Sequence, residues 1–241
     1  MRVLRMFIFS TLFFMASCAI VRKPSLVSAP DDAVVVDTLT ASVSVSLRSK
    51  AGNMSGNGLI RYRRPDCFRL VILSPFGSTV MEAYAKGEWL ALLYPTQKLA
   101  FFGSFDDVPD DSAMRAWRLL RWAMDLPPPS SSASNDVVKR TSLVTGGLET
   151  VIYRSGLAIS KTSSEGDQVA YTNYSLVNGA ILAAELLLET ANHDRIRIVF
   201  DDPEINAPLD DSAFIPEFKN IRVLPLAELP FSPATGNGSK K

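Results

Sequence analysis

Residues 41–47 read Ala-Ser-Val-Ser-Val-Ser-Leu, so that an apolar side chain alternates with a serine at every step. Successive side chains of a β-strand point to opposite faces of a sheet, and a period of two therefore predicts a strand with one buried and one wet face. The same alternation returns at 58–63, 68–73, 182–189 and 195–200, and weaker strand-like runs lie at 78–86, 88–95, 98–102, 148–154, 157–162 and 168–176. The sequence therefore predicts a mainly β fold of about 10–11 short strands separated by turn residues.

Helices are almost absent between these runs, which favours an antiparallel sheet, because parallel strands need a crossover connection. One amphipathic helix is predicted over 111–125 and ends before Pro127. Its apolar face carries Ala113, Trp117, Leu120 and Met124, and its basic edge carries Arg115, Arg118 and Arg121. A large sheet has to close, to cover its apolar face or to leave exposed edges, and this helix is a natural cover. We therefore expect a curved, incompletely closed antiparallel β-barrel with a helical lid. Residues 30–38 fit a short helix or a strand.

Composition and charge exclude several classes of function. The chain has 241 residues, with 25 Lys+Arg, 25 Asp+Glu and 47% hydrophobic residues, as in an ordinary globular domain. A neutral chain has no basic field to concentrate it on nucleic acid. One His and two Cys are too few for a typical zinc site. The single His193 lies in a polar turn and Cys67 has no His nearby in the sequence, so we expect neither an enzyme nor a metal or other cofactor.

The N-terminus has the pattern of a targeting segment. Two arginines within residues 1–5 precede an apolar run at 6–16. That run is shorter than the roughly 20 residues of a membrane-spanning helix. The sequence Met15-Ala16-Ser17-Cys18 then resembles the lipobox of bacterial lipoproteins. This resemblance implies that Cys18 is acylated and becomes the first residue of the mature chain. A plain signal peptide and a membrane-retained helix are the alternatives.

Four segments follow from this interpretation. Residues 1–17 are the lipoprotein signal peptide, 18–34 the lipidated N-terminus and tether, 35–229 the folded domain, and 230–241 a disordered tail. Residue 19 is Ala and not the Asp that marks inner-membrane retention in lipoproteins, so the resemblance points to the outer membrane, with the domain facing the periplasm.

Two internal segments carry a further resemblance. Residues 68–80 (FRLVILSPFGSTV) and 120–127 (LRWAMDLP) are similar, in the same order, to segments of LolB in the LolA/LolB superfamily of bacterial lipoprotein carriers. Residues 171–201 also look like the last LolB strands, so the resemblance covers roughly residues 38–206. It implies a domain, expected to be monomeric, that binds acylated lipoproteins in an apolar cavity. A LolA-type periplasmic carrier would deliver them, and the outer membrane would receive them.

The resemblance also implies site residues. The loop Pro75, Phe76 and Gly77 matches the LolB loop whose exposed Leu delivers cargo into the membrane, although an aromatic residue replaces the aliphatic one. Phe76 could protrude in the same way or fold back onto the core. The candidates for the acyl-chain cavity are the inward strand residues and the lid: Val43, Val45, Leu47, Ile60, Tyr62, Phe68, Leu70, Ile72, Trp117, Leu120 and Trp122.

The same apolar residues would also build a solid core, because lining and filling require the same period. A hollow interior favours the lipoprotein carrier. A filled interior favours a structural or assembly lipoprotein of the envelope that uses the fold to bind a protein partner or another lipid. Residues 207–229 extend past the expected end of LolB and could form an extra strand or a clasp.

Overall fold

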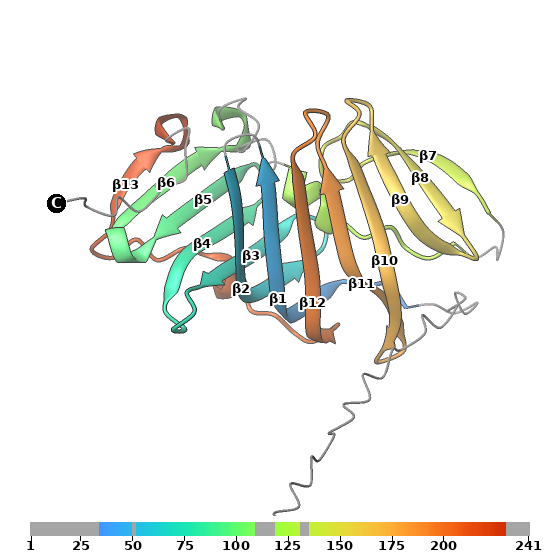
Figure 1. Ribbon diagram of the computed structural model, residues 1–241, viewed down its shortest axis with the longest axis horizontal. Helices are drawn as coiled ribbons and strands as arrows, with labels where there is room; N and C mark the ends of the chain where they lie inside the picture. Colours follow the sequence, from blue (N-terminus) through green and yellow to red (C-terminus); the bar gives the residue numbers. More distant parts are fainter. Residues whose placement is uncertain (1–33, 50–51, 109–118, 131–134, 230–241) are drawn as a thin grey trace, which may run out of the picture.

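The computed structural model describes residues 34–49, 52–108, 119–130 and 135–229 (Figure 1). These residues form thirteen strands of a single sheet. The strands are β1 (Thr38–Ser49), β2 (Gly52–Arg63), β3 (Cys67–Leu73), β4 (Thr79–Lys86), β5 (Trp89–Tyr94), β6 (Leu99–Ser104), β7 (Val137–Thr141), β8 (Leu148–Arg154), β9 (Leu157–Ser163), β10 (Gln168–Val177), β11 (Ala180–Glu189), β12 (Arg195–Ile205) and β13 (Arg222–Pro225). The helical parts are the 3-10 turns η1 (Pro95–Gln97), η2 (Phe105–Asp107), η3 (Asp211–Phe214) and η4 (Leu226–Glu228), and an α-helical segment at 119–124.

The sheet is strongly twisted and its two edges do not join. Figure 1 shows β13 at one edge and β7 at the other, with the order β13-β6-β5-β4-β3-β2-β1-β12-β11-β10-β9-β8-β7 between them. All neighbouring strands are antiparallel except β13, which runs parallel to β6. The predicted fold class, a mainly β protein with one curved and incompletely closed antiparallel sheet, is confirmed.

The alternation in β1 sets the orientation of the sheet's centre. Ala41, Val43 and Val45 are buried, whereas Ser42 and Ser44 are exposed. Strand β1 pairs with β2 on one side and with β12 on the other, so these apolar side chains face the main hydrophobic cluster from the middle of the sheet. The period of two therefore places the core on one face, as the sequence predicts.

One strand, β7, was not anticipated, and β13 lies in the segment 207–229, for which an extra strand was one of two alternatives. The predicted runs account for eleven of the thirteen described strands, and β7 and β13 are the additional ones. Strand β7 reads Val-Val-Lys-Arg-Thr, which shows no alternation of apolar and polar residues, and it lies at an edge with most side chains exposed. Residues 30–38 were expected to form a short helix or a strand. In the described part of this segment, Val34 makes an isolated parallel bridge to Ala180 and β1 begins at Thr38, so no helix forms there.

The helical segment 119–124 lies against one face of the middle of the sheet (Figure 1). It is the C-terminal part of the helix predicted over 111–125, whose residues up to 118 lie outside the described ones. Leu120, Trp122 and Met124 are buried in the same cluster as the inward residues of β1, β2 and β3. The segment therefore covers the core from the concave side.

Residues 207–229 act both as a clasp and as a strand. Ala213 and Phe214 of η3 pack on Cys67, and Phe218 and Ile221 pack against a small cluster on the outer face of β4, β5 and β6. Strand β13 then extends the sheet beyond β6, and Leu226 returns to the main cluster. All strands and hydrophobic clusters of the described part lie within residues 34–229, and a chain that begins at residue 19 contains all of them.

Candidate functional site

The residues predicted to line a cavity share one face and one cluster. The buried members are Val43, Val45, Ile60, Tyr62, Phe68, Leu70 and Ile72, and Leu47 packs against them from a partly buried position. Leu120 and Trp122 complete the same cluster from the helical segment. Trp117 lies outside the described residues. The structure thus brings the strand candidates and two of the three lid candidates together.

Only a small cavity remains between them. Its volume is about 20 Å³, and its walls are Val45, Leu47, Met54, Leu70, Ile72, Leu120, Ile196 and Ile198. A cavity of this size has room for about one water molecule, so it holds no acyl chain in this arrangement. Around these candidate residues the concave face is therefore closed, and Val43, Ile60, Tyr62, Phe68 and Trp122 fill the core without lining the cavity.

Three wall residues were missed by sequence reasoning. Ile196 and Ile198 were recognised as inward residues of a strand, but their pairing with β1 opposite Leu47 and Val45 could not be foreseen. Met54 belongs to the first half of β2, which reads as a glycine-rich turn and not as a strand. It is 36% exposed and forms the outer rim of the cavity.

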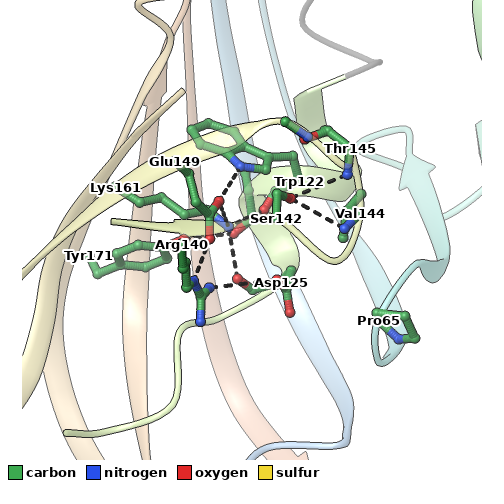
Figure 2. A network of polar contacts seen from close by, with 12 residues as sticks. Pro65, Trp122, Asp125, Arg140, Ser142, Val144, Thr145, Glu149, Lys161 and Tyr171 are labelled. Atoms are coloured by element: carbon green, nitrogen blue, oxygen red, sulfur yellow. Dashed lines mark hydrogen bonds and ion pairs between the residues drawn. The ribbon is translucent and has the colours of Figure 1, made fainter. Parts of the chain in front are cut away.

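A buried polar network holds the end of the helical segment against the sheet (Figure 2). Glu149 on β8 accepts hydrogen bonds from Trp122 Nε1 and from Arg140 Nε of the neighbouring strand β7, both at 2.6 Å. Glu149 and Arg140 are directly paired across the two strands. Trp122 therefore binds through its ring nitrogen to a carboxylate whose position a cross-strand arginine fixes.

Lysine and tyrosine side chains bind the last carbonyls of the segment. Lys161 Nζ on β9 donates to the carbonyl oxygens of Trp122 and Asp125, the latter at 2.8 Å, and Tyr171 on β10 donates to the carbonyl of Ala123 at 3.2 Å. The last carbonyls of a helix have no partners within the helix and carry partial negative charge. Lys161 supplies both the donors and the complementary charge.

Asp125 connects this network to the other half of the sheet. Its side chain is fully buried and forms ion pairs with Arg64, from the turn after β2, at 3.3 Å and with Arg140 at 3.8 Å. Its two carboxylate oxygens have no hydrogen-bond partner among the described residues. Arg64 and Arg140 come from distant parts of the sheet, so Asp125 bridges the two halves at the end of the helical segment.

Burial shifts the pKa values of the charged groups here. Desolvation lowers the pKa of Lys161 to about 8, against the raising effect of Asp125 and Glu149. Desolvation also raises the pKa of Asp125, although Lys161, Arg64 and Arg140 oppose this shift. Three cations share these two buried carboxylates, and of the three only Lys161 is fully buried while Arg64 and Arg140 are partly exposed. Removal of either carboxylate therefore leaves the buried charge of Lys161 with less compensation.

Arg121 was predicted to lie on the basic edge of the helix, and in the structure its side chain is buried. Its guanidinium lies 4.4 Å from the centre of the Phe105 ring and donates to the carbonyl of Gly87 in the turn after β4. Burial lowers its pKa. The helical segment is thus held at a second point, on the side away from Lys161.

Phe76 stands at the tip of the hairpin between β3 and β4, and 97% of its surface is exposed. Ser74 shapes the turn: its carbonyl accepts from the amide of Gly77 at 2.9 Å, and its hydroxyl accepts from the amides of Phe76 and Ser78. Gly77 has φ of +80°, which a glycine adopts without strain. Of the two expected positions for Phe76, the protruding one is therefore observed, with Pro75 and Gly77 on either side.

The remaining residues singled out in the sequence lie away from the concave cavity or outside the described residues. Cys18 is outside the described residues, so its acylation stays a prediction. Cys67 is a buried free thiol whose pKa is raised by desolvation, and His193 is exposed in a turn beside Glu189 at 3.1 Å. Within the described ranges, no helix is long and apolar enough to cross a membrane. Nor do the described His, Cys, Asp and Glu side chains form a group of three that could hold a metal ion.

No family model matches the chain, and no curated protein matches it in sequence. Solved structures do resemble it. An outer membrane lipoprotein-sorting protein domain from Vibrio parahaemolyticus is 11% identical, with a TM-score of 0.51 over 73% of this chain and 88% of that one. A DUF1329 family protein from Desulfovibrio piger is 10% identical, with a TM-score of 0.51 over 80% and 93% of the two chains. A LolA superfamily protein from Nitrosomonas europaea is 15% identical, with a TM-score of 0.49 over 79% and 98%. The likeness extends to the fold, and it does not single out LolB.

Proposed function

We propose that this chain is a carrier of the bacterial envelope that binds the acyl chains of lipoproteins against its concave apolar face and helps insert them into the outer membrane. The observation that carries the proposal is the position of Phe76. This fully protruding aromatic side chain stands on the hairpin that follows Ile72, and Ile72 is a wall residue of the apolar cavity. An apolar binding face and an exposed apolar tip are thus joined by a single strand.

Uptake of an acyl chain requires the helical segment 119–124 to move, because the cavity of about 20 Å³ is closed by Leu120. Burial of apolar chain offers a driving force of roughly 0.8 kcal/mol per methylene. A chain that displaces Leu120 would gain contact with Val45, Leu70 and Ile72 and would oppose the polar network that holds Trp122 and Asp125. Transfer then follows differential burial, from a LolA-type donor to this face and from this face to the bilayer.

The N-terminus fits the same location. The lipobox-like sequence ending at Cys18 supports acylation of that cysteine and attachment to the periplasmic side of the outer membrane. The Phe76 hairpin would supply an additional contact.

Cargo retention tests the cavity. The chain from residue 19 is offered an acylated lipoprotein on a LolA-type donor and examined by native mass spectrometry. Met54→Gln is expected to reduce retained cargo several-fold, because an amide at the cavity rim disfavours acyl contact. Leu187→Gln is the matched control, since Leu187 is 37% exposed, against 36% for Met54, but lies on the outer face of β11. Equal retention by the two variants would argue against the concave face as the binding site.

Delivery to a bilayer tests the hairpin. Phe76→Glu is expected to reduce transfer of bound cargo into vesicles by about tenfold or more while leaving cargo uptake intact, because a charged tip no longer partitions into the lipid interface. Leu143→Glu changes another exposed apolar loop residue, 70% exposed, away from the hairpin. Normal delivery by the Phe76 variant would remove the hairpin from the mechanism.

A second function is favoured by the closed interior. If the domain folds but retains no acylated cargo, the packed core fits a structural or assembly lipoprotein that binds a protein partner or another lipid through its surface. Phe76 would then be a contact residue.

A further inference from the structure

A second groove lies at the base of the Phe76 hairpin, on the outer face of the sheet. Its volume is about 270 Å³ and it lies over β2, β3 and β4. Its floor is apolar, with Leu59, Val71 and Leu73, and its polar walls are Arg61, Arg69 and Glu82. Leu59 is 48% exposed although it lies in the middle of the sheet. This groove is separate from the concave cavity, which faces the opposite side of the same strands.

The strand register orders the groove along its length. Leu73 ends β3 directly before the hairpin, Leu59 and Val71 form the next outward cross-strand pair, and Arg61 and Arg69 form the pair after that. Leu73 is four positions along β3 from Arg69, which corresponds to about 13 Å along a strand. The groove therefore runs from an apolar end beside the hairpin to a cationic end within the sheet.

Charge at the cationic end is unbalanced. Arg69 donates to Glu82 at 2.7 Å, and its guanidinium lies 5.0 Å from the centre of the Tyr84 ring. Arg61 lies directly opposite Arg69 and has no ion pair or side-chain hydrogen bond within the described part of the chain. Like charges directly opposite each other destabilise a strand pair, and an anion bound between them removes this penalty. The groove thus carries one net positive charge beside an apolar floor.

We propose that this groove binds an anionic phospholipid of the bilayer, with the phosphate at Arg61 and the first acyl carbons on Leu59, Val71 and Leu73. The proposal rests on the membrane contact of the Phe76 hairpin and adds an orientation to it. The outer face of β2, β3 and β4 would lie toward the bilayer surface. The amphipathic order of the groove matches a lipid lying in the interface, where apolar groups are deepest and cations meet the phosphates.

Vesicle binding without any cargo tests the charge. The chain from residue 19 is mixed with vesicles of phosphatidylcholine alone or with phosphatidylglycerol, and bound protein is separated by flotation. Arg61→Gln is expected to weaken binding to the phosphatidylglycerol vesicles about tenfold. Arg154→Gln, which changes an exposed arginine on β8, is expected to bind like the unchanged chain. Equal binding by both variants, or equal binding to both kinds of vesicle, would overturn the proposal.

Site-specific probes separate the groove from the hairpin. An environment-sensitive fluorophore is attached to Leu59→Cys, Phe76→Cys or Ile152→Cys, where Ile152 is an outward residue of β8. Blue shifts at both 59 and 76, with none at 152, are expected on phosphatidylglycerol vesicles. A shift at 76 alone would refute the groove and leave hairpin insertion standing. No shift at either position would refute both, whatever the result of the cargo experiment.

Discussion

Replacement of Glu149 by alanine is expected to lower the free energy of unfolding by roughly 3–5 kcal/mol, the usual cost of breaking a buried ion pair by removing one partner. Glu149 accepts from Trp122 and Arg140 at 2.6 Å and lies 3.9 Å from Lys161 Nζ. Without it, the buried Lys161 and the partly exposed Arg140 lose a carboxylate, and the indole nitrogen loses its acceptor. The total free energy of unfolding of a domain is about 5–15 kcal/mol, so this one replacement would remove a large part of it.

Two further variants separate the effect of losing a buried group from the effect of losing a charge. Glu149→Gln keeps an acceptor for Trp122 and is expected to cost less than Glu149→Ala. Glu185→Ala removes a carboxylate that pairs with Arg197 on the outer face, and is expected to cost within about 1 kcal/mol. Stabilities come from urea unfolding. A Glu149→Ala variant as stable as Glu185→Ala would show that the network does not hold the helical segment.

Hydrogen exchange locates the effect. In Glu149→Gln, amides at 119–125 are expected to exchange faster than in the unchanged chain, because the segment is attached through the Trp122 side chain and through carbonyls bound by Lys161 and Tyr171. Amides in β1 and β12, at the centre of the sheet, should keep their protection. Uniform loss of protection would instead indicate a global change.

The strands could be predicted because each has its own local pattern. The alternation at 41–47 is independent of the rest of the chain, and so is that at 195–200. Strand β7 could not be predicted in this way, because it lies at an edge and its one inward charged residue, Arg140, is explained only by Glu149 across the sheet. Strand β13 is defined by its partner β6, more than a hundred residues earlier in the chain.

The residues of the concave face could be predicted from the sequence, but whether that face is open or closed could not. Period-two alternation places Leu70 and Ile72 on the concave face, but whether that face is open depends on how deeply Leu120 and Trp122 reach into it. The polar network could not be predicted from the sequence, for a related reason. Lys161 reads as a solvent-facing residue in Leu-Ala-Ile-Ser-Lys-Thr-Ser, although its side chain is fully buried. Only the helix end packed over it supplies the acceptors that make this burial tolerable.

The second large effect is a rise of stability with pH, carried by Lys161. Burial lowers its pKa to about 8, from 10.5 for an exposed lysine. At pH 7 both the folded and the unfolded chain hold the proton. Between pH 8 and 10.5 the unfolded chain still binds it and the folded chain does not, so the contribution of Lys161 to the free energy of unfolding increases with pH. The slope is about 1.4 kcal/mol per pH unit at most, and about 3 kcal/mol over the whole interval.

Other groups act in the opposite direction, and a difference measurement removes them. The raised pKa values of Cys67 and of the buried tyrosines lower stability at alkaline pH, because the unfolded chain ionises first. They are common to the unchanged chain and to Lys161→Met, so the stability of the unchanged chain minus that of the variant is expected to rise between pH 8 and 9.5. Lys139→Met, which removes an exposed lysine of β7, is the matched control.

The shape of this stability difference, plotted against pH, also separates two roles of Lys161, that of a hydrogen-bond donor and that of a buried charge. The variant loses the donors to the carbonyls of Trp122 and Asp125 at every pH, which shifts the whole difference curve without changing its slope. A neutral amine still donates to these carbonyls but no longer pairs with Glu149, so the slope reports charge alone. A flat curve would mean that Asp125 and Glu149 keep Lys161 protonated despite its burial. The helix end would then be held by a permanent ion pair, and its release would not respond to pH in this range.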